Sequence, residues 1–189
     1  MKYFIVGFNS SGKQQIVDDL KKLNVRIGQI FRSREEIDAS IYSLSSIVYS
    51  NKDIDDIFEN HAYVFMTERQ DKEPFFEGLS TYEYENNDVF MITPDQFSLV
   101  PKFDSDVCFV WLDNNYNNRR ARYLHDKRKY NFQKQDDAER VDIQDFIDRV
   151  YDNDVLYFVN EDPARVAAII YSLITYPELH ELYKNRFKE

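Results

Sequence analysis

A short apolar segment at residues 3–6 runs directly into a loop with the spacing G-x-x-x-x-G-K, from Gly7 to Lys13. A helix-like stretch at residues 15–20 follows the loop. A strand, a glycine loop and a helix in this order let successive main-chain N–H groups and the positive end of a helix dipole face an anion. Only four glycines occur in the chain, and two of them hold the required positions. The pattern therefore favours a phosphate-binding loop over a turn that merely contains Gly and Lys.

One position of this loop departs from the usual pattern. The residue after the lysine is normally Ser or Thr, and its hydroxyl binds Mg²⁺. Here that residue is Gln14. The Gln14 carbonyl, or the hydroxyl of Ser10 or Ser11, is an alternative oxygen ligand. Lys13 is expected to contact phosphate in either case.

Length and charge narrow the class of protein. The chain has 189 residues, of which 43% are hydrophobic and 16% aromatic, enough for the core of one α/β domain. The formal net charge of −10 argues against a nucleic acid polymer or an anionic membrane as partner. The single cysteine, Cys108, lies in an apolar run and is expected to be buried. No signal peptide, disulfide framework or membrane span is indicated, so we expect a cytoplasmic protein.

Apolar runs and helix-like stretches alternate along the sequence. The runs predict strands at residues 3–6, 89–92, 107–112 and 155–159. Helices are predicted at residues 15–23, 52–60, 117–129, 136–151, 163–176 and, as a short terminal helix, 177–189. This alternation is typical of a parallel sheet, where ligands bind at the carboxyl ends of the strands. Residues 26–81 do not show this alternation of strands and helices, and they predict a small inserted unit of a few strands and one helix.

Five segments, in this order, resemble the guanylate kinase family. The first is the glycine loop. Residues 30–36 look like the family's T-T-R-x-x-R-x-G-E with altered arginine spacing, and residues 48–60 like F-V-S-x-x-x-F-x-x-x-I-x-x-G. Residues 77–80 stand in the place of Y-G-T-S. The fifth segment is the carboxyl-terminal third, where the run ending at residue 162 resembles Y-D-x-V-V-x-N-D-D and follows several arginines: Arg119, Arg120, Arg122, Arg128 and Arg140.

The resemblance implies an α/β P-loop kinase fold over residues 1–189 as a single domain. Helices would flank a parallel core sheet (residues 1–30 and 86–189), with an acceptor-binding subdomain at about 31–85 and a lid at about 119–142. The implied activity is ATP-dependent phosphorylation of a nucleoside or deoxynucleoside monophosphate, with ATP and Mg²⁺ as cofactors. The implied partners are these two nucleotides, and a homodimer is possible.

The same resemblance assigns roles to individual residues. The catalytic residues would be Lys13, Arg122 and Arg140. ATP would contact Gly7, Asn9, Ser10, Ser11, Gly12, Lys13, Gln14 and Asn160. The acceptor would contact Arg32, Arg34, Phe65, Glu68, Glu77 and Ser80. Mg²⁺ would be held through Asp95.

The chain departs from the family where the acceptor would be read. The family's guanine-contacting Glu becomes Phe65, which cannot form the hydrogen bonds that distinguish guanine from adenine; Glu68 would take that role if the register shifts by three. The phosphate-binding Tyr becomes Glu77, and an Asp that ends the second core strand becomes Pro94, beside Asp95. These changes favour an alternative: a guanylate-kinase-like domain that has lost catalysis and binds a nucleotide or a protein.

Several charged residues keep a structural interpretation beside the functional one. Arg32 and Arg34 would clamp a phosphate or lie in a solvated turn next to acidic residues. The arginines of the proposed lid would otherwise face solvent. Asp95 is favoured for metal binding, and Asp113 for capping the following helix. The three histidines share no metal-ligand spacing, so no zinc site is expected.

Overall fold

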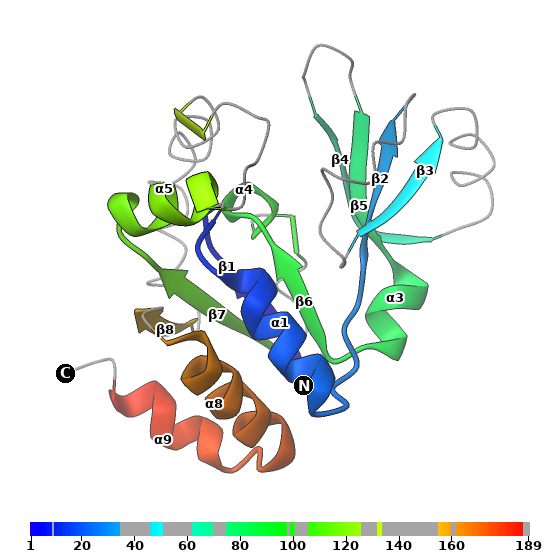
Figure 1. Cartoon of the computed structure of the whole chain (residues 1–189). Coiled ribbons are helices and arrows are strands. Elements are labelled where there is room, and N and C mark those ends of the chain that lie inside the picture. The colour runs from blue at the N-terminus through cyan, green and yellow to red at the C-terminus, as the bar shows by residue number, and fades with distance from the viewer. Residues whose placement is uncertain are drawn as a thin grey trace.

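The residues that the structure describes form two four-stranded sheets (Figure 1). The structure is a computed structural model, and it describes residues 1–8, 10–34, 46–50, 62–69, 75–97, 99–100, 106–125, 132–133, 155–159 and 162–186. Within these residues no helix is long and apolar enough to cross a membrane.

The first sheet is parallel throughout and has the strand order β6-β1-β7-β8. Its strands are β1 (Lys2–Val6), β6 (Val89–Ile92), β7 (Val107–Asp113) and β8 (Val155–Val159). Both faces of β1 and β7 are buried, which explains why their sequences are continuous apolar runs without polar alternation.

Helices α1 (Lys13–Lys22), α8 (Pro163–Thr175) and α9 (Leu179–Arg186) lie on one side of this sheet (Figure 1). Ile16, Val17 and Leu20 form the buried stripe of α1 and pack in one cluster with apolar residues of β1, β7 and α8. Asp162 caps α8 by accepting hydrogen bonds from the N–H groups of residues 164 and 165 (3.1 and 3.3 Å), and proline follows at the first helical position.

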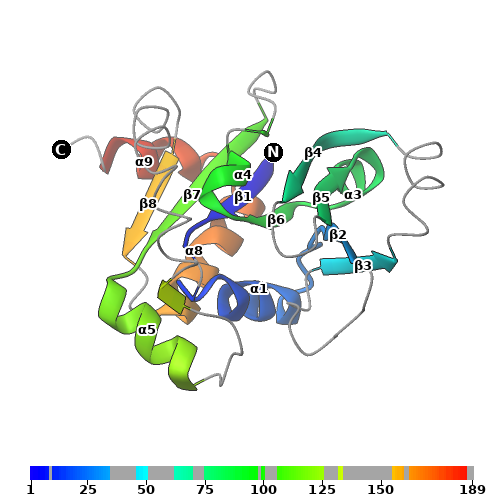
Figure 2. The same ribbon diagram turned by 90° about the horizontal axis from the view of Figure 1, so that it is seen from above.

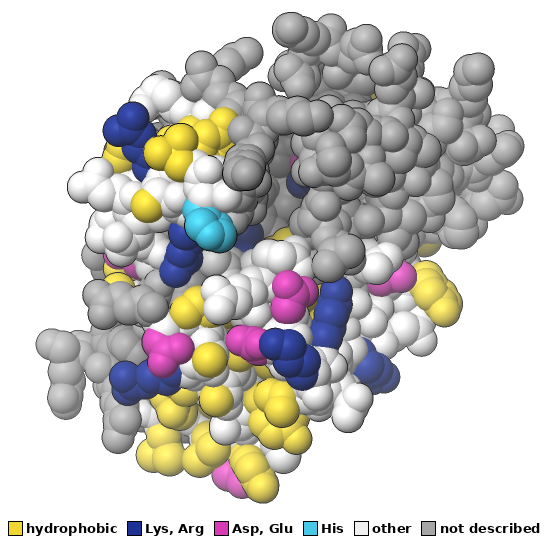
Figure 3. Space-filling view, in the orientation of Figure 1, with side chains coloured by type: hydrophobic (Ala, Val, Ile, Leu, Met, Phe, Trp, Pro, Cys, Tyr) yellow, Lys and Arg dark blue, Asp and Glu magenta, His cyan; other side chains and the backbone are white. Residues whose placement is uncertain are grey.

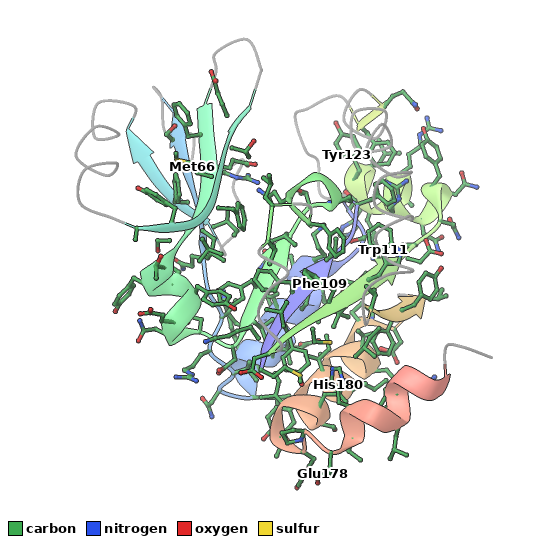
Figure 4. The ribbon with its side chains drawn as sticks, turned by 180° about the vertical axis from the view of Figure 1, so that it is seen from behind. Met66, Phe109, Trp111, Tyr123, Glu178 and His180 are labelled. Carbon is green, nitrogen blue, oxygen red and sulfur yellow. The ribbon has the colours of Figure 1, made fainter. Side chains whose placement is uncertain are left out.

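The opposite side of the first sheet carries an aromatic cluster. Phe4, Phe90, Phe109 and Trp111 belong to it, and Phe97 joins from the short helix α4 (Pro94–Phe97). Figure 4, seen from behind, shows Phe109 and Trp111 on this side of β7. The second sheet also contributes to this cluster, so the packing ties the two sheets together.

The second sheet has the order β3-β2-β5-β4 and mixes parallel with antiparallel pairs. Its strands are β2 (Ile30–Arg34), β3 (Ser46–Ser50), β4 (Tyr63–Arg69) and β5 (Phe75–Ser80). Helix α3 (Thr81–Asn86) leads from β5 to β6, and its first turn is capped by Ser80, which accepts a hydrogen bond from the Glu83 N–H at 3.2 Å. Figure 2 shows this sheet beyond β6, on the side away from β8.

The predicted α/β class with a parallel sheet is confirmed. The strands predicted at residues 89–92 and 155–159 have those limits, whereas β1 and β7 are each one residue longer than predicted. Helix α5 (Tyr116–His125) is described only to residue 125, and α8 ends at Thr175. The helices predicted at residues 52–60 and 136–151 lie outside the described residues.

Candidate functional site

The glycine loop leaves β1 at the carboxyl edge of the first sheet, and its backbone requires glycine at two points. A Cβ atom on Gly7 would lie 2.8 Å from the Ser11 Oγ and 3.0 Å from the main-chain oxygen of Leu112 in β7. Gly12 has a φ angle of 95°, a backbone conformation that residues other than glycine rarely adopt. Ser10 also has a positive φ, 59°. The loop is therefore tightly curled against the end of β7.

Helix α1 starts directly at this loop. Gly12 is its N-cap and, as a glycine, has no side chain that could cap the helix. The first N–H groups of an α-helix have no acceptor within the helix, and the helix dipole makes this end positive. A curled loop that ends in such a turn has the main-chain arrangement that binds phosphate oxygens.

Lys13 brings a positive charge into the loop. Its ammonium group donates hydrogen bonds to the main-chain oxygens of Gly7 and Phe8, the second at 2.9 Å. The residue is buried, with 9% of its surface exposed. The structure thus places the lysine charge against the loop, where the sequence motif predicts it.

The strand order locates this loop at a switch point of the sheet. From β1 the chain continues to β6 on one side, and from β7 it continues to β8 on the other. Adjacent strands whose connections leave in opposite directions open a crevice at their carboxyl ends, and open α/β sheets bind ligands there. The glycine loop after β1 and helix α5 after β7 flank this position (Figure 1).

Two arginines of α5 reach the loop. Arg122 donates a hydrogen bond from an Nη atom to the main-chain oxygen of Ser11 at 2.8 Å. Arg119 is 2% exposed, donates from Nε to the Asn114 oxygen at 3.2 Å, and lies 4.7 Å from the ring centre of Phe8. Rings of Tyr116 and Phe132 are also within reach of its guanidinium group, at 6.0 and 5.8 Å.

Both arginines were predicted to belong to the lid, and of the two only Arg122 was also predicted to be catalytic. The spacing of three residues between them places both on one face of the helix, because residues i and i+3 are neighbours there. Figure 4 shows Tyr123 on the same helix. The Tyr123 and Phe132 rings pack with their centres 5.2 Å apart, so the ring that faces Arg119 is itself held against α5.

The metal-binding corner of the loop fits Mg²⁺ poorly. Gln14 donates a hydrogen bond from its amide nitrogen to Asp18 Oδ1 at 2.8 Å, one turn further along α1. An amide nitrogen that carries its hydrogens is not a metal ligand, so from this side chain only the amide oxygen could bind Mg²⁺, and the hydrogen bond holds the amide group toward Asp18. The side chain of Asp95, the other predicted metal residue, lies outside what the structure describes.

Asp113 does not cap α5 as predicted. Asn115 does so instead, because its side-chain oxygen accepts a hydrogen bond from the Asn118 N–H at 2.8 Å. Asp113 is the last residue of β7, and Tyr157 of β8 donates its hydroxyl hydrogen to it. Burial, followed by this hydrogen bond, raises the pKa of Tyr157 well above the usual range for tyrosine. Asp113 thus joins two strands of the sheet.

On the second sheet, Arg32 and Glu77 face each other across β2 and β5. Arg32 Nε lies 2.6 Å from Glu77 Oε1, and the amide nitrogen of Gln96 donates to Glu77 Oε2 at 3.0 Å. Glu77 is 3% exposed. Arg32 is therefore in a strand and not in the solvated turn that we considered. Both oxygens of the Glu77 carboxylate are engaged, and Gln96 links them to α4 beside the first sheet.

The other predicted acceptor residues have diverse surroundings. Phe65 is buried in the aromatic cluster, Glu68 is exposed, and Ser80 caps α3. Their roles toward an acceptor stay predictions. Five predicted site residues lie wholly or with their side chains outside the described residues: Asn9, Arg34, Asp95, Arg140 and Asn160.

Comparison with known proteins agrees with this architecture. The chain superposes on the crystal structure of guanylate kinase from Anaplasma phagocytophilum with a TM-score of 0.57 and 13% sequence identity, covering 99% of this chain and 95% of that chain. The chain has the guanylate kinase fold. No family model matches the sequence, and no curated protein matches it. At this identity the similarity establishes the fold and leaves the activity to be argued from the site.

Proposed function

We propose that the chain binds ATP at the glycine loop and transfers the terminal phosphoryl group to a nucleoside or deoxynucleoside monophosphate. One observation carries the proposal. Lys13 and Arg122, from elements more than one hundred residues apart in sequence, meet on the same loop at the positive end of α1. Such convergence of cations and N–H groups suits a chain of phosphates.

ATP supplies the phosphoryl group, and the protein supplies position and charge. Phosphoryl transfer needs little covalent chemistry from the enzyme, because electrostatic stabilisation and alignment provide most of the rate enhancement. In our proposal Lys13 and Arg122 hold the phosphate oxygens, and Arg119 adds positive charge from a site without solvent. The loop N–H groups fix the direction of the chain of phosphates. None of these roles depends on Mg²⁺, because the Gln14 amide is held toward Asp18.

The acceptor would lie beside the second sheet, which corresponds to the subdomain predicted at about residues 31–85. Arg32 is the candidate for the acceptor phosphate, together with Arg34. The remaining candidates are Phe65, Glu68, Glu77 and Ser80 as predicted, with Arg140 joining Arg122 in catalysis and Asn160 joining the ATP site. A homodimer has no support from the described residues or the comparisons. Figure 3 shows hydrophobic side chains gathered over α8 and α9, but no partner is assigned to them.

A second candidate function is a nucleotide-binding domain without catalysis. Three observations on the described residues favour it. Gln14 is hydrogen-bonded along α1, Glu77 forms an ion pair with Arg32, and Phe65 is buried where the family reads guanine. This alternative keeps the ATP site and removes the transfer.

Binding of ATP to the loop is tested by thermal unfolding and calorimetry. ATP should raise the melting temperature of the protein, since a ligand that binds only the native state stabilises it. Lys13→Ala should weaken ATP binding by about 100-fold, the effect of losing charged hydrogen bonds, and should leave the protein folded without ligand. Lys21→Ala, at the far end of the same helix, is the control. Equal ATP affinity in wild type and Lys13→Ala would refute the loop as the site.

Transfer is tested with a panel of ribo- and deoxynucleoside monophosphates in the presence of ATP and Mg²⁺. We expect turnover with an acceptor other than guanine monophosphate, because Phe65 cannot enforce guanine. Arg122→Ala and Arg140→Ala should each lower kcat by on the order of 100-fold, as for loss of one positioned donor. Activity confined to guanine monophosphates would show that another acid reads the base. ATP binding without any transfer would favour the second candidate.

A further inference from the structure

We infer that the loop binds the phosphates of its nucleotide without a divalent cation, and that Lys13, Arg119 and Arg122 supply the charge that the metal would otherwise supply. The ligand class is a metal-free nucleoside triphosphate or diphosphate. This inference rests on the proposed ATP site and goes beyond it, because neither the fold nor the proposed activity specifies which ionic form is bound.

The direction of the Gln14 side chain is the first support. Its amide nitrogen donates to Asp18 at 2.8 Å. Asp18 is four residues later, which is about 6 Å further along the helix axis. This hydrogen bond therefore leads the side chain along α1, away from the turn that faces the loop. A hydroxyl at this position would be short and would stay beside the first turn, so position 14 lacks the hydroxyl that usually fixes the metal there.

The second support is the number of positive groups around the loop. Lys13 contacts the oxygens of Gly7 and Phe8, and Arg122 contacts the oxygen of Ser11. Arg119 stacks on Phe8, the residue that follows Gly7. An arginine keeps its charge when buried, and a charge in a site of low dielectric acts strongly on nearby anions. These three groups bring positive charge close to the loop at which the chain of phosphates would bind.

The rigidity of Arg119 is the third support. Its guanidinium group lies between the rings of Phe8, Tyr116 and Phe132, at 4.7 to 6.0 Å from their centres. Its Nε atom is directed to the Asn114 oxygen at 3.2 Å. A cation held in this way needs no reorganisation when an anion arrives, whereas a bound metal has to enter with the ligand.

The test compares the affinity for ATP in excess EDTA with that in excess MgCl₂, by isothermal titration calorimetry of the full chain at constant ionic strength. We expect the two dissociation constants to agree within about fivefold. Binding that is tighter in MgCl₂ by a larger factor would overturn the inference and leave the ATP site intact. No binding in either condition would refute the ATP site as well, so the two failures are distinguishable.

A variant of Gln14 tests the same inference in the opposite direction, by introducing a metal ligand. Gln14→Thr places a hydroxyl at the metal-binding corner and should create a dependence on Mg²⁺, with ATP bound about tenfold more tightly in MgCl₂ than in EDTA. Gln15→Thr, the same substitution at the exposed next position, should keep the wild-type ratio. Equal metal dependence in wild type and Gln14→Thr, with both binding better in MgCl₂, would show that another group holds the cation and that the inference is wrong.

Discussion

Positively charged side chains have different partners at the glycine loop and in the second sheet. At the loop, Lys13, Arg119 and Arg122 donate to main-chain oxygens, which carry no net charge. In the second sheet, Arg32 lies against the buried carboxylate of Glu77. The contacts of the loop cations thus include main-chain oxygens, whereas Arg32 is paired with a buried carboxylate.

This difference determines how easily a phosphate can bind. A phosphate oxygen is a stronger acceptor than a carbonyl oxygen, so it can replace the carbonyl partners of the loop with a gain in free energy. A phosphate that displaced Glu77 from Arg32 would leave the Glu77 carboxylate buried without its cation, which is strongly unfavourable. We therefore expect the loop to bind an anion more readily than Arg32, whose proposed contact with the acceptor phosphate has to compete with Glu77.

The largest effect should come from Phe65→Ala, because Phe65 is a core residue of the cluster that joins the two sheets. Truncating it should lower the free energy of unfolding by about 3–5 kcal/mol, measured in urea, with ATP affinity unchanged. Glu68→Ala on the same strand, exposed to solvent, is the control and should leave stability unchanged. A stable Phe65→Ala protein with altered acceptor binding would instead show that Phe65 belongs to the ligand site.

Glu77→Ala should have the next largest effect. Removing one partner of a buried ion pair leaves the other partly buried, and we expect a loss of about 3 kcal/mol in the free energy of unfolding. Asp19→Ala breaks an exposed ion pair with Lys22 and should change stability little, since water screens that pair. Equal effects of the two substitutions would show that burial does not make the pair of Arg32 and Glu77 more important for stability than an exposed pair.

Glu77→Gln sharpens the same comparison, because it keeps the shape of the side chain and removes its charge. Arg32 then becomes available to an anion. Binding of inorganic phosphate or a nucleoside monophosphate should increase by about tenfold relative to wild type, in a competition assay that leaves the ATP site saturated. Weaker binding of the monophosphate would show that Glu77 positions Arg32 for the acceptor.

Arg122→Ala should weaken ATP binding by about tenfold, or about 1.4 kcal/mol, while stability stays close to that of wild type. The guanidinium group is only half-buried and contributes through the ligand and through Ser11. Arg120→Ala on the same helix, exposed, is the matched control. Calorimetry in EDTA measures both. An equal loss of affinity in the two variants would mean that the net positive charge of helix α5, and not the position of Arg122, attracts the nucleotide.

The smallest effect should come from Ser80→Ala. Ser80 caps the short helix α3, and losing that hydrogen bond should lower the free energy of unfolding by about 1 kcal/mol. Ser172→Ala within α8 should change it by less than about 0.5 kcal/mol. If Ser80→Ala unfolds like the wild type but binds the acceptor more weakly, Ser80 contacts the acceptor as the sequence predicted.

The sequence predicted the first sheet better than the second. Continuous apolar runs such as residues 89–92 mark buried parallel strands, and helix α1 begins where the glycine motif requires. The strand order of the first sheet was not predictable, because buried parallel strands have similar compositions. In the second sheet, β2 contains Arg32 and β5 contains Glu77, so their polar residues concealed the strands. Only their pairing across the sheet explains both charges.

The candidate site, like the fold, was predicted only in part from the sequence. The motif identified Lys13 and the loop, and Arg122 was selected from the arginines that follow β7. Arg119 was predicted as a lid residue, but its burial was not predicted, because its three aromatic neighbours, among them Phe8 and Phe132, come together only in the fold. The role of Asn115 as helix cap was missed because Asp113 is an equally good capping residue in sequence.

Strand β1 has a consequence for how the chain folds during synthesis. It is a central strand, yet its partners β6 and β7 are formed by Val89–Ile92 and Val107–Asp113. At about 5–20 residues per second, the ribosome needs on the order of 5–20 s to produce them. Throughout that interval the segment Tyr3–Val6 is an apolar strand without its sheet, open to association with other chains. Refolding yields that fall as protein concentration rises would reveal this early exposure.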